Sequence, residues 1–311
     1  MPDPVISVRG LRKSYNGFEA VRGIDLEVRA GEIFAFLGPN GAGKTTTVEI
    51  LEGYRSRNGG EVSVLGTDPA AARRSWRERI GIVLQECRLT PELTVREAVE
   101  QYAGYYSSAR DVGETVALVG LGEKADVRTS KLSGGQRRRL DVALALVGDP
   151  ELLFLDEPTT GFDPAARRQA WEVIGNLREL GKTIFLTTHY MEEAQSLADR
   201  VAILAAGQVV AEGAPGELAT RDARSRISFR VPAAQRPELP ALARNGAQLT
   251  QAGEELEVSL RVDDPVPALR ELTVWATDRD VPVHALEVRR PTLEDVYLEL
   301  TGAERDEELE A

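Results

Sequence analysis

The run of residues from 38 to 46 combines glycines, a lysine and hydroxyl side chains at a spacing suited to phosphate chemistry. It reads Gly38-Pro39-Asn40-Gly41-Ala42-Gly43-Lys44-Thr45-Thr46, which fits the pattern G-x-x-x-x-G-K-[ST]. Glycines let successive backbone N–H groups approach phosphate oxygens. A lysine at this place reaches the β- and γ-phosphates, and the hydroxyl of Thr45 can ligate Mg²⁺. The alternative is a glycine-rich turn that holds no ligand.

The residues around this run predict the elements that must position it. Ile33 to Phe36 form a short apolar run typical of a buried strand. Val48, Ile50 and Leu51 continue beyond the glycines as a helix, which Gly53 is suited to end. The start of a helix adds partial positive charge, so a strand, a glycine loop and a helix start together predict a phosphate cradle.

Two more predicted strands end in polar residues. Leu152 to Leu155 is fully apolar, is typical of a central parallel strand and is followed by Asp156 and Glu157. Thr183 to Leu186 repeats the pattern and leads to His189. Open α/β sheets bind ligands at the carboxyl edge of their strands, where two carboxylates need a cation. The alternatives are the start of a solvated loop for the carboxylates and a structural role for the histidine.

Two further polar or aromatic side chains depend on their surroundings for a role. Gln85 follows a predicted buried strand, Ile80 to Leu84, and matters only if it faces the phosphates. Tyr15 is placed in a loop between a predicted edge strand from Val5 to Arg9 and a second strand from Ile24 to Val28. Its ring could stack on adenine or simply pack on its own subdomain.

The segment Leu132-Ser133-Gly134-Gly135-Gln136 predicts a second helix start with exposed backbone N–H groups. Ser133 is placed to cap the helix that follows. The alternative is an ordinary helix start, with the arginines at 137–139 as a solvated face. The region from Leu93 to Gly148 has helical spacing, and its aromatics, Tyr102 and Tyr106 among them, are interpreted as core residues.

Composition narrows the classes of function. A chain of 311 residues with 42% hydrophobic residues suggests two domains, each with a core. The net charge of −12 argues against a nucleic-acid partner, because there is no basic field to displace counterions. The one cysteine, Cys87, excludes an intrachain disulfide. We find no signal peptide and no apolar window of about 18 residues, so a membrane role would need a separate partner.

Taken together, these motifs resemble the nucleotide-binding subunit of an ATP-binding cassette (ABC) transporter. The resemblance spans about Val5 to Leu218 and rests on five ordered elements: the phosphate loop, Gln85, residues 132–136, Asp156-Glu157 and His189. It implies an α/β fold of the P-loop NTPase kind, with a RecA-like core, an antiparallel β subdomain and a helical subdomain at about 88–148. The implied domain covers residues 1–222.

The resemblance also implies a role for each site residue, with ATP and Mg²⁺ as cofactors. Lys44 and the backbone of residues 38–46 would hold the phosphates. Thr45, Gln85 and Asp156 would hold Mg²⁺. Glu157 would act as general base, with His189 on the γ-phosphate and Tyr15 on adenine.

The same resemblance implies a site shared between two chains. Ser133, Gly134 and Gly135, beside Gln136, would contact the γ-phosphate held by a second copy, so ATP would bring two copies into a homodimer. Asp163 matches a carboxylate that links the two sites. Phe162 departs from the family, which usually has leucine there, but leaves the acidic group in place.

Residues 223–302 predict an accessory α+β domain, and residues 303–311 a disordered acidic tail. The order β-α-β-β-α-β suggests a ferredoxin-like topology, with a short helix at Leu239 to Ala243 and a strand at Val281 to Val288. Thr292 and Asp295 predict a capping box for a last helix, ended by Gly302.

This layout resembles the ATPase subunits of bacterial drug exporters of the daunorubicin-resistance kind, including the run Pro291-Thr292-Leu293-Glu294-Asp295-Val296-Tyr297. It implies a separate transmembrane permease, export, and a peripheral place on the cytoplasmic face of the cell membrane. The alternatives are a soluble ABC ATPase acting on nucleic acid or ribosomes and a nucleotide sensor that does not hydrolyse ATP. The acidic charge disfavours the former, and Glu157 with His189 disfavours the latter.

Overall fold

The computed structural model describes residues 4–83, 90–219, 224–240, 247–289 and 292–301. The chain divides into two compact units, Met1–Pro215 with Leu300–Gly302, and Gly216–Glu299 with 303–311. Each unit has a sheet and a core of its own. The predicted domain limits at 222 and 302 remain predictions.

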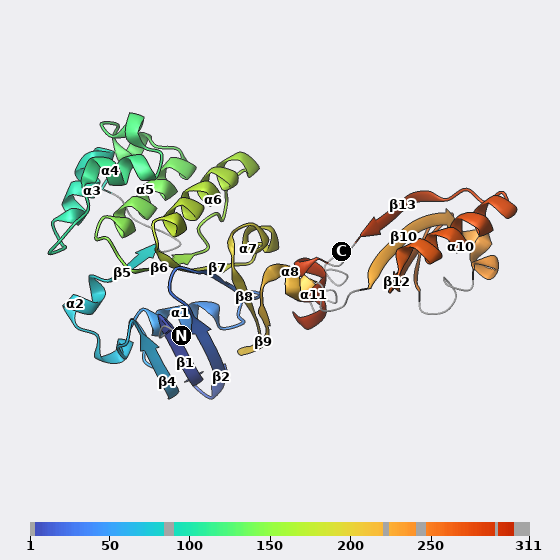
Figure 1. Cartoon of the computed structure of the whole chain (residues 1–311), viewed down its shortest axis with the longest axis horizontal. Helices are drawn as coiled ribbons and strands as arrows, with labels where there is room; N and C mark the ends of the chain where they lie inside the picture. Colours follow the sequence, from blue (N-terminus) through green and yellow to red (C-terminus); the bar gives the residue numbers. More distant parts are fainter. Residues whose placement is uncertain (1–3, 84–89, 220–223, 241–246, 290–291, 302–311) are drawn as a thin grey trace. The chain divides into compact units, whose positions relative to one another are not determined.

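The first unit is built on a six-stranded sheet in the order β5-β6-β7-β3-β8-β9 (Figure 1). Its strands are β3 (Ile33–Leu37), β5 (Ile80–Val83), β6 (Leu152–Asp156), β7 (Thr183–Thr188), β8 (Arg200–Ala205) and β9 (Gln208–Gly213). All neighbours are parallel except β8 and β9, which form an antiparallel hairpin. Because both faces of a parallel sheet are covered, its central strands are largely apolar, and every residue of β3 and β7 is buried.

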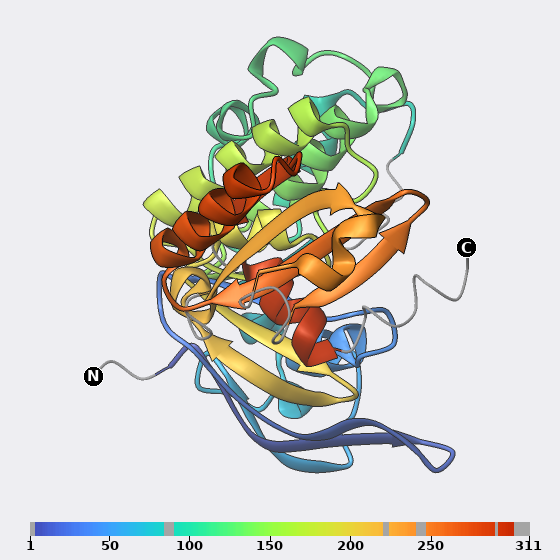
Figure 2. The same ribbon diagram turned by 90° about the vertical axis from the view of Figure 1, so that its right-hand side faces the viewer.

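A second, antiparallel sheet in the same unit has the order β2-β1-β4, and its β1–β2 hairpin is a long ribbon (Figure 2). The strands are β1 (Ile6–Tyr15), β2 (Phe18–Val28) and β4 (Gly59–Val64). The prediction of an edge strand at Val5 to Arg9 is wrong, because β1 lies between the other two. Its second partner, β4, follows about fifty residues later, and the alternation of residues within one strand does not reveal such a neighbour.

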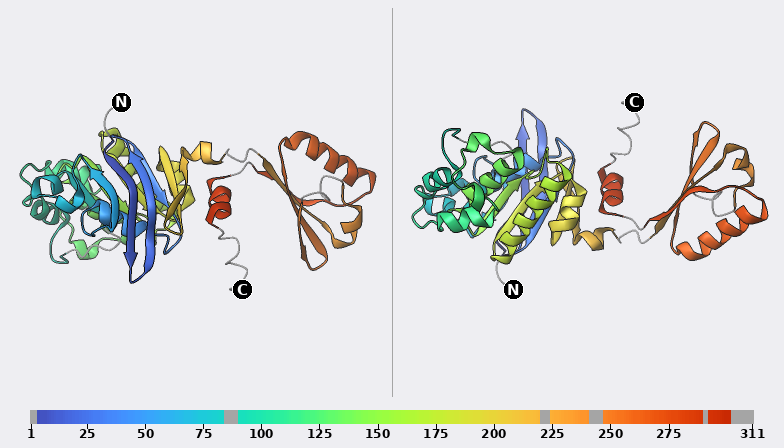
Figure 3. Two further views of the ribbon diagram at one scale, coloured as in Figure 1. Left: turned by 90° about the horizontal axis from the view of Figure 1, so that it is seen from below. Right: turned by 90° about the horizontal axis from the view of Figure 1, so that it is seen from above.

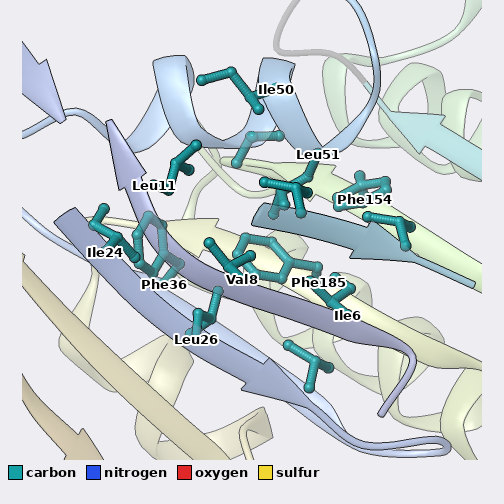
Figure 4. Packing of buried hydrophobic residues seen from close by; sticks show 14 of the residues in the cluster. Ile6, Val8, Leu11, Ile24, Leu26, Phe36, Ile50, Leu51, Phe154 and Phe185 are labelled. Atoms are coloured by element: carbon teal, nitrogen blue, oxygen red, sulfur yellow. The ribbon is translucent and has the colours of Figure 1, made fainter. Parts of the chain in front are cut away.

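The core of this unit lies between the two sheets (Figure 4). Helix α1 (Lys44–Leu51) contributes Ile50 and Leu51, and the antiparallel sheet contributes residues such as Leu11 and Ile24. Phe185 in β7 contacts Phe34, Phe36 and Phe154, with ring centroids 5.6–5.7 Å apart. Burying one such ring contributes roughly 1.5–3 kcal/mol, so this cluster holds the strands that carry the site in fixed register.

Helices cover the rest of the first unit (Figure 1). They are α2 (Arg74–Arg77), α3 (Val95–Ala103), α4 (Val112–Leu118), α5 (Gly134–Leu146), α6 (Pro164–Glu179) and α7 (Met191–Leu197), with single turns at Pro69–Ala71, Gly122–Lys124 and Thr129–Lys131. Four of those described, α3, α4, α5 and α6, start after a residue whose side chain caps them. Thr94 and Ser133 form capping boxes, so the predicted cap at Ser133 is confirmed. Tyr102 is 37% exposed, so its assignment to the core is wrong; it lies in the last turn of α3, beyond the buried Val95 and Val99.

The second unit contains a four-stranded antiparallel sheet in the order β11-β12-β10-β13, with α10 on one face (Figure 3). The elements are α8 (Pro215–Ala219, whose first residue belongs to the first unit), β10 (Ser225–Pro232), a 3₁₀ segment (Ala233–Glu238), β11 (Gln248–Ala252), β12 (Glu255–Val262), α10 (Pro265–Asp278), β13 (His284–Arg289) and α11 (Leu293–Thr301, whose last two residues belong to the first unit). Leu272 and Trp275 of α10 pack in one cluster with Ile227 and Phe229 of β10.

Some predictions for this unit are met and others fall outside the described residues. Thr292 and Asp295 form the predicted capping box at the start of α11. The last strand begins at His284, later than the predicted Val281, which instead packs in the core cluster. Most of the predicted helix at Leu239 to Ala243, together with Gly302 and residues 303–311, lies outside the described residues. Within the part of the chain that is described, no helix combines the length and the apolar character needed to cross a membrane.

Candidate functional site

The candidate site forms where three neighbouring parallel strands end. Strand β7 lies between β6 and β3, so Asp156 stands opposite Thr187 and Leu37 opposite Thr188. The glycine loop after β3, Glu157 after β6 and His189 after β7 therefore meet at one edge of the sheet, which is the edge predicted from the sequence.

The glycine loop is held tightly against its surroundings. A Cβ atom on Gly43, whose φ is +102°, would lie 2.6 Å from the carbonyl oxygen of Ala20, and one on Gly38 would lie 2.6 Å from that of Leu204. Lys44 starts α1 and donates from its ammonium group to the carbonyl oxygens of Gly38 at 2.5 Å and Pro39 at 3.2 Å. The loop therefore has its backbone N–H groups and one buried cation in a fixed arrangement.

Burial and nearby charges shift the pKa of the Lys44 ammonium group in opposite directions. Burial lowers its pKa, whereas the nearby charges of Glu157 and Asp156 raise it. The two acidic residues are thus close enough to Lys44 to act on its charge. A phosphate placed here would meet a cation on one side and carboxylates on the other.

A cavity of about 800 Å³ opens over the loop. It is lined by Tyr15, Phe18, Ala20, Pro39, Asn40, Gly41, Gly43, Lys44, Thr45, Thr46, Glu157, Thr160 and His189. The structure thus brings most of the predicted nucleotide-binding residues together around one space. Gly38 and Ala42 do not line it; both are buried beneath the loop.

Tyr15 lies at the end of strand β1, directly opposite Phe18 in β2, so its assignment to a loop is wrong. The turn between them is only two residues long, which extends the strand to Tyr15. Lys13 and Arg55 lie over the tyrosine ring, at 5.2 and 5.4 Å from its centroid. Tyr15 and the exposed Phe18 present two aromatic side chains at the mouth of the cavity.

Thr187 ties the two carboxylate residues to β7. Its hydroxyl donates a short hydrogen bond to Oδ1 of Asp156 and accepts one from the backbone N–H of Glu157 at 3.2 Å. The same N–H donates to the carbonyl oxygen of Thr187 at 3.1 Å. These bonds fix the main chain of Glu157 in an unusual conformation, with φ at +44°, which costs on the order of 1–3 kcal/mol for a residue other than glycine.

The side chain of Glu157 is held between two polar neighbours. Its Oε2 atom accepts a hydrogen bond from the Thr160 hydroxyl at 3.1 Å, and its Oε1 atom lies 3.3 Å from Nδ1 of His189. The carboxylate is 15% exposed and His189 37% exposed, so both can reach the cavity. A carboxylate oriented in this way is suited to accept a proton from water.

A second cavity, of about 790 Å³, also borders Glu157. It is lined by Ser133, Gly134, Gly135, Gln136, Arg137, Arg138, Arg139, Asp141, Glu157, Thr160, Gly161, Phe162, Asp163, Ala166 and Gln169. Glu157 and Thr160 line both cavities. The remaining predicted residues, 133–136 and Asp163, therefore face a different space from Lys44 within one chain.

Several polar groups at this second cavity also serve the fold. The Ser133 hydroxyl accepts from the backbone N–H of Gln136 at 3.3 Å, and Oε1 of Gln136 accepts from the N–H of Ser133 at 3.1 Å. Asp163 caps α6 by accepting from the N–H groups of Ala165 and Ala166, each at 2.9 Å. Their positions are thus fixed before any ligand is present.

The described residues fit Mg²⁺ in part. Thr45 contributes a hydroxyl that lines the cavity, and Asp156, which does not line it, contributes a carboxylate close enough to act on the charge of Lys44; Mg²⁺ takes few protein oxygens and keeps several waters. Gln85, the third predicted ligand, lies outside the described residues. Among those that are described, no group of three or more His, Cys, Asp or Glu residues could hold a metal, so a metal here would also need ligands from the nucleotide and water.

Three residues that contribute to the site were not predicted from the sequence. Thr187 and Thr160 bind Asp156 or Glu157, and Phe18 faces Tyr15. The alternative of a solvated face for the arginines is wrong for Arg138, which is 8% exposed and donates to the main chain around Glu157. Helical spacing could have signalled this, because Arg138 shares a face with the buried Val142.

A phosphate-binding loop between a parallel strand and a helix, facing acidic residues at the next strand ends, defines a P-loop nucleotide-binding ATPase of the α/β class. Residues 21–160 match the family model described as ABC transporter, and residues 225–292 match the C-terminal domain of ABC transporter domain-containing proteins. The chain belongs to the ABC transporter ATP-binding family and is an ATPase whose hydrolysis of ATP is coupled to transport.

Similar proteins extend over nearly the whole chain. The daunorubicin/doxorubicin resistance ATP-binding protein DrrA of Streptomyces peucetius is 38% identical, over 98% of this chain and 95% of its own length. The Nod factor export ATP-binding protein I of Ralstonia nicotianae is 40% identical, over 97% and 95%. An ATP-binding cassette solved as a dimer in a post-hydrolysis state with ADP and Pi superposes with a TM-score of 0.60 at 26% identity, covering 67% of this chain and 98% of that one.

Proposed function

We propose that this chain is the ATP-hydrolysing subunit of an exporter for a drug or another hydrophobic small molecule. Two copies close on Mg²⁺ and ATP, and hydrolysis drives export through a separate membrane subunit. The observation that carries the proposal is the place of Glu157, which borders both the cavity of the glycine loop and the Ser133 cavity.

The first cavity holds the nucleotide and carries the chemistry. The N–H groups of the loop and Lys44 bind the β- and γ-phosphates, and Tyr15 stacks on adenine. Thr45 and Asp156, with Gln85, hold Mg²⁺, which neutralises phosphate charge. Glu157 takes a proton from the attacking water, and His189, 3.3 Å from its Oε1 atom, binds the γ-phosphate.

The second cavity receives the nucleotide of a second copy. Ser133, Gly134 and Gly135 present a helix start, whose N–H groups and partial positive charge suit a γ-phosphate. Asp163 lies in the same cavity as Glu157 and so stands between the two sites of the dimer. The dimeric relative bound to ADP and Pi supports this arrangement.

The names of the relatives support export and a membrane partner. One relative is named for daunorubicin and doxorubicin resistance and another for Nod factor export. We therefore place this chain at the cytoplasmic face of the cell membrane, bound to a permease and without a nucleic-acid partner. The net charge of −12 agrees with the last point.

Mixed dimers test whether the site is shared between two chains. Ser133→Arg blocks the second cavity, Lys44→Ala disables the first, and each variant alone should release no phosphate from ATP. An equimolar mixture should recover up to about a quarter of the parental rate, because about half of the dimers are mixed and each has one intact site; coupling between the two sites would lower this fraction.

The matched control is an equimolar mixture of Lys44→Ala chains with Glu157→Gln chains. Both changes lie on the same half of the site, so no mixed dimer has an intact site and no phosphate release should be recovered. If the first mixture also recovers nothing, or if Ser133→Arg alone keeps its activity, the shared site is refuted.

Inverted membrane vesicles test the export step. Vesicles carrying a candidate permease and this chain should accumulate doxorubicin when ATP and Mg²⁺ are added. Vesicles carrying Glu157→Gln should not. Equal doxorubicin accumulation in both kinds of vesicle would show that ATP hydrolysis by this chain does not drive the movement. If the chain does not bind to vesicles that carry the permease, the proposed membrane partner is wrong.

A further inference from the structure

Arg138 is a buried cation whose contacts run to the main chain of the residues around Glu157. It lies in α5, five residues after Ser133, and is 8% exposed. Its Nη2 atom donates to the carbonyl oxygens of Asp156 at 2.7 Å and Glu157 at 3.4 Å, and its Nε atom donates to that of Pro158 at 3.1 Å. One guanidinium group therefore holds three successive carbonyl groups.

These bonds complete the fixation of Glu157. Its N–H group is bound by Thr187 of β7, and its carbonyl side is bound by Arg138 of α5. Left-handed backbone at a residue other than glycine persists only where the surroundings impose it, and φ of Glu157 is +44°. The planar, forked guanidinium suits this task, because its donors point to several acceptors at once.

The charge of Arg138 is balanced within the same helix. Nη1 lies 3.9 Å from Oδ2 of Asp141, and both side chains are less than a tenth exposed. Removing two charges from water has an unfavourable free energy, so we expect this buried pair to have a role besides packing.

The helix that carries Arg138 also carries the start that would meet the second copy. Ser133 and Gln136 form the capping box of α5, so the helix start and Arg138 belong to one continuous element. Glu157 lines the cavity of the glycine loop together with Lys44 of its own chain, and so would act on the nucleotide bound there. Arg138 therefore connects α5, whose start would contact the nucleotide of the second copy, to Glu157, which would act on the nucleotide of its own chain.

We propose that Arg138 is a positioning residue that couples these two sites. When the ATP of a second copy engages Ser133, α5 is held in place, and Arg138 holds the carbonyl groups around Glu157 so that its carboxylate stays aimed at water. The inference rests on the proposed function, since it takes Glu157 as the base and Ser133 as the contact to the second copy. Coupling of this kind is a free energy shared between sites and is measurable as cooperativity.

The test is Arg138→Lys, which keeps the positive charge but cannot bind the carbonyl groups of Asp156 and Pro158 together. Turnover at saturating Mg²⁺ and ATP should fall at least tenfold, and the Hill coefficient for ATP should fall toward one. The dissociation constant of a fluorescent ATP analogue and the melting temperature should remain near the parental values. The control is Arg74→Lys, which removes an arginine–carbonyl bond, to Tyr105 at 3.1 Å, away from both cavities and should change none of these.

Mixed dimers separate positioning of Glu157 from general support of α5. In the mixture of Ser133→Arg with Lys44→Ala, the working site takes Glu157 from the first chain and the helix start from the second. Arg138→Lys in the first chain should abolish the recovered activity, and in the second chain should leave most of it. Equal losses from both placements would show that Arg138 supports the helix rather than Glu157 and would overturn the inference.

Glu157→Gln measured alongside keeps the two proposals apart. If it loses turnover while Arg138→Lys keeps the parental rate, the inference is wrong and the proposed function stands. If Glu157→Gln itself keeps the parental rate, the proposed function is wrong.

Discussion

Glu52 should make the stability of the first unit depend on pH near neutrality. It follows helix α1, is 6% exposed and lines a cavity of about 520 Å³ with Tyr54, Arg77, Tyr106 and Asp141. Burial raises its pKa from 4.5 to about 8, and the charges of Asp156 and Glu49 add to the effect. The folded protein therefore keeps Glu52 protonated at neutral pH.

The direction in which stability changes with pH follows from proton binding by Glu52. Because the folded state binds this proton more tightly than the unfolded state, its stabilising contribution is full below pH 4.5 and is lost as the pH rises toward 8. The loss is about 1.4 kcal/mol per pH unit within that window, or about 2 kcal/mol between pH 6 and pH 8. Glu52→Gln cannot ionise and should lack this loss.

The assay is urea unfolding at pH 6 and pH 8 in a Trp275→Phe background. The chain has three tryptophans, so Trp76 and Trp171 then report on the first unit alone. The parental protein should lose about 2 kcal/mol more than Glu52→Gln over this range. Glu151→Gln is the control, because Arg79 lowers the pKa of Glu151 and places its titration below the window. Equal losses in the parental protein and Glu52→Gln would refute a protonated Glu52.

Three further substitutions probe the nucleotide site. Gly43→Ala places a Cβ atom 2.6 Å from the carbonyl oxygen of Ala20 at φ +102°, so it should lower the free energy of unfolding by about 1–3 kcal/mol or abolish ATP binding. A parental melting temperature together with parental binding of a fluorescent ATP analogue would contradict this. Tyr15→Ala should weaken that binding by about 2- to 12-fold through loss of stacking, while Tyr15→Phe keeps it; equal binding by both would count against stacking. Thr187→Val removes the hydroxyl that binds Asp156 and should lower turnover more than it weakens ATP binding, whereas Thr187→Ser should restore turnover in phosphate-release assays; a variant with the parental rate would show that this hydroxyl does not position the carboxylates.

Much of the fold was predictable because its signals are local. The apolar runs of β3, β6 and β7 predict buried parallel strands, and the polar residues that follow them share one edge by geometry alone. The cap at Ser133 was predictable because a helical run follows it directly. These parts depend on neighbours a few residues apart.

The parts that escaped prediction depend on contacts between distant segments. The central place of β1 comes from pairing with β4, and the exposure of Tyr102 from how α3 lies on the unit. Three successive arginines look alike in the sequence, yet only Arg138 points at the loop after β6. Thr187 is one of three threonines in β7, and its role appears only when β6 lies beside it.

The most direct test of the central claim is the rate of phosphate release by Glu157→Gln in Mg²⁺ and ATP. If Glu157 takes the proton from water, the rate should fall at least about a hundredfold while ATP still binds. The same sample should then hold two copies together, since the nucleotide is not consumed. A variant that hydrolyses ATP at the parental rate would contradict the account.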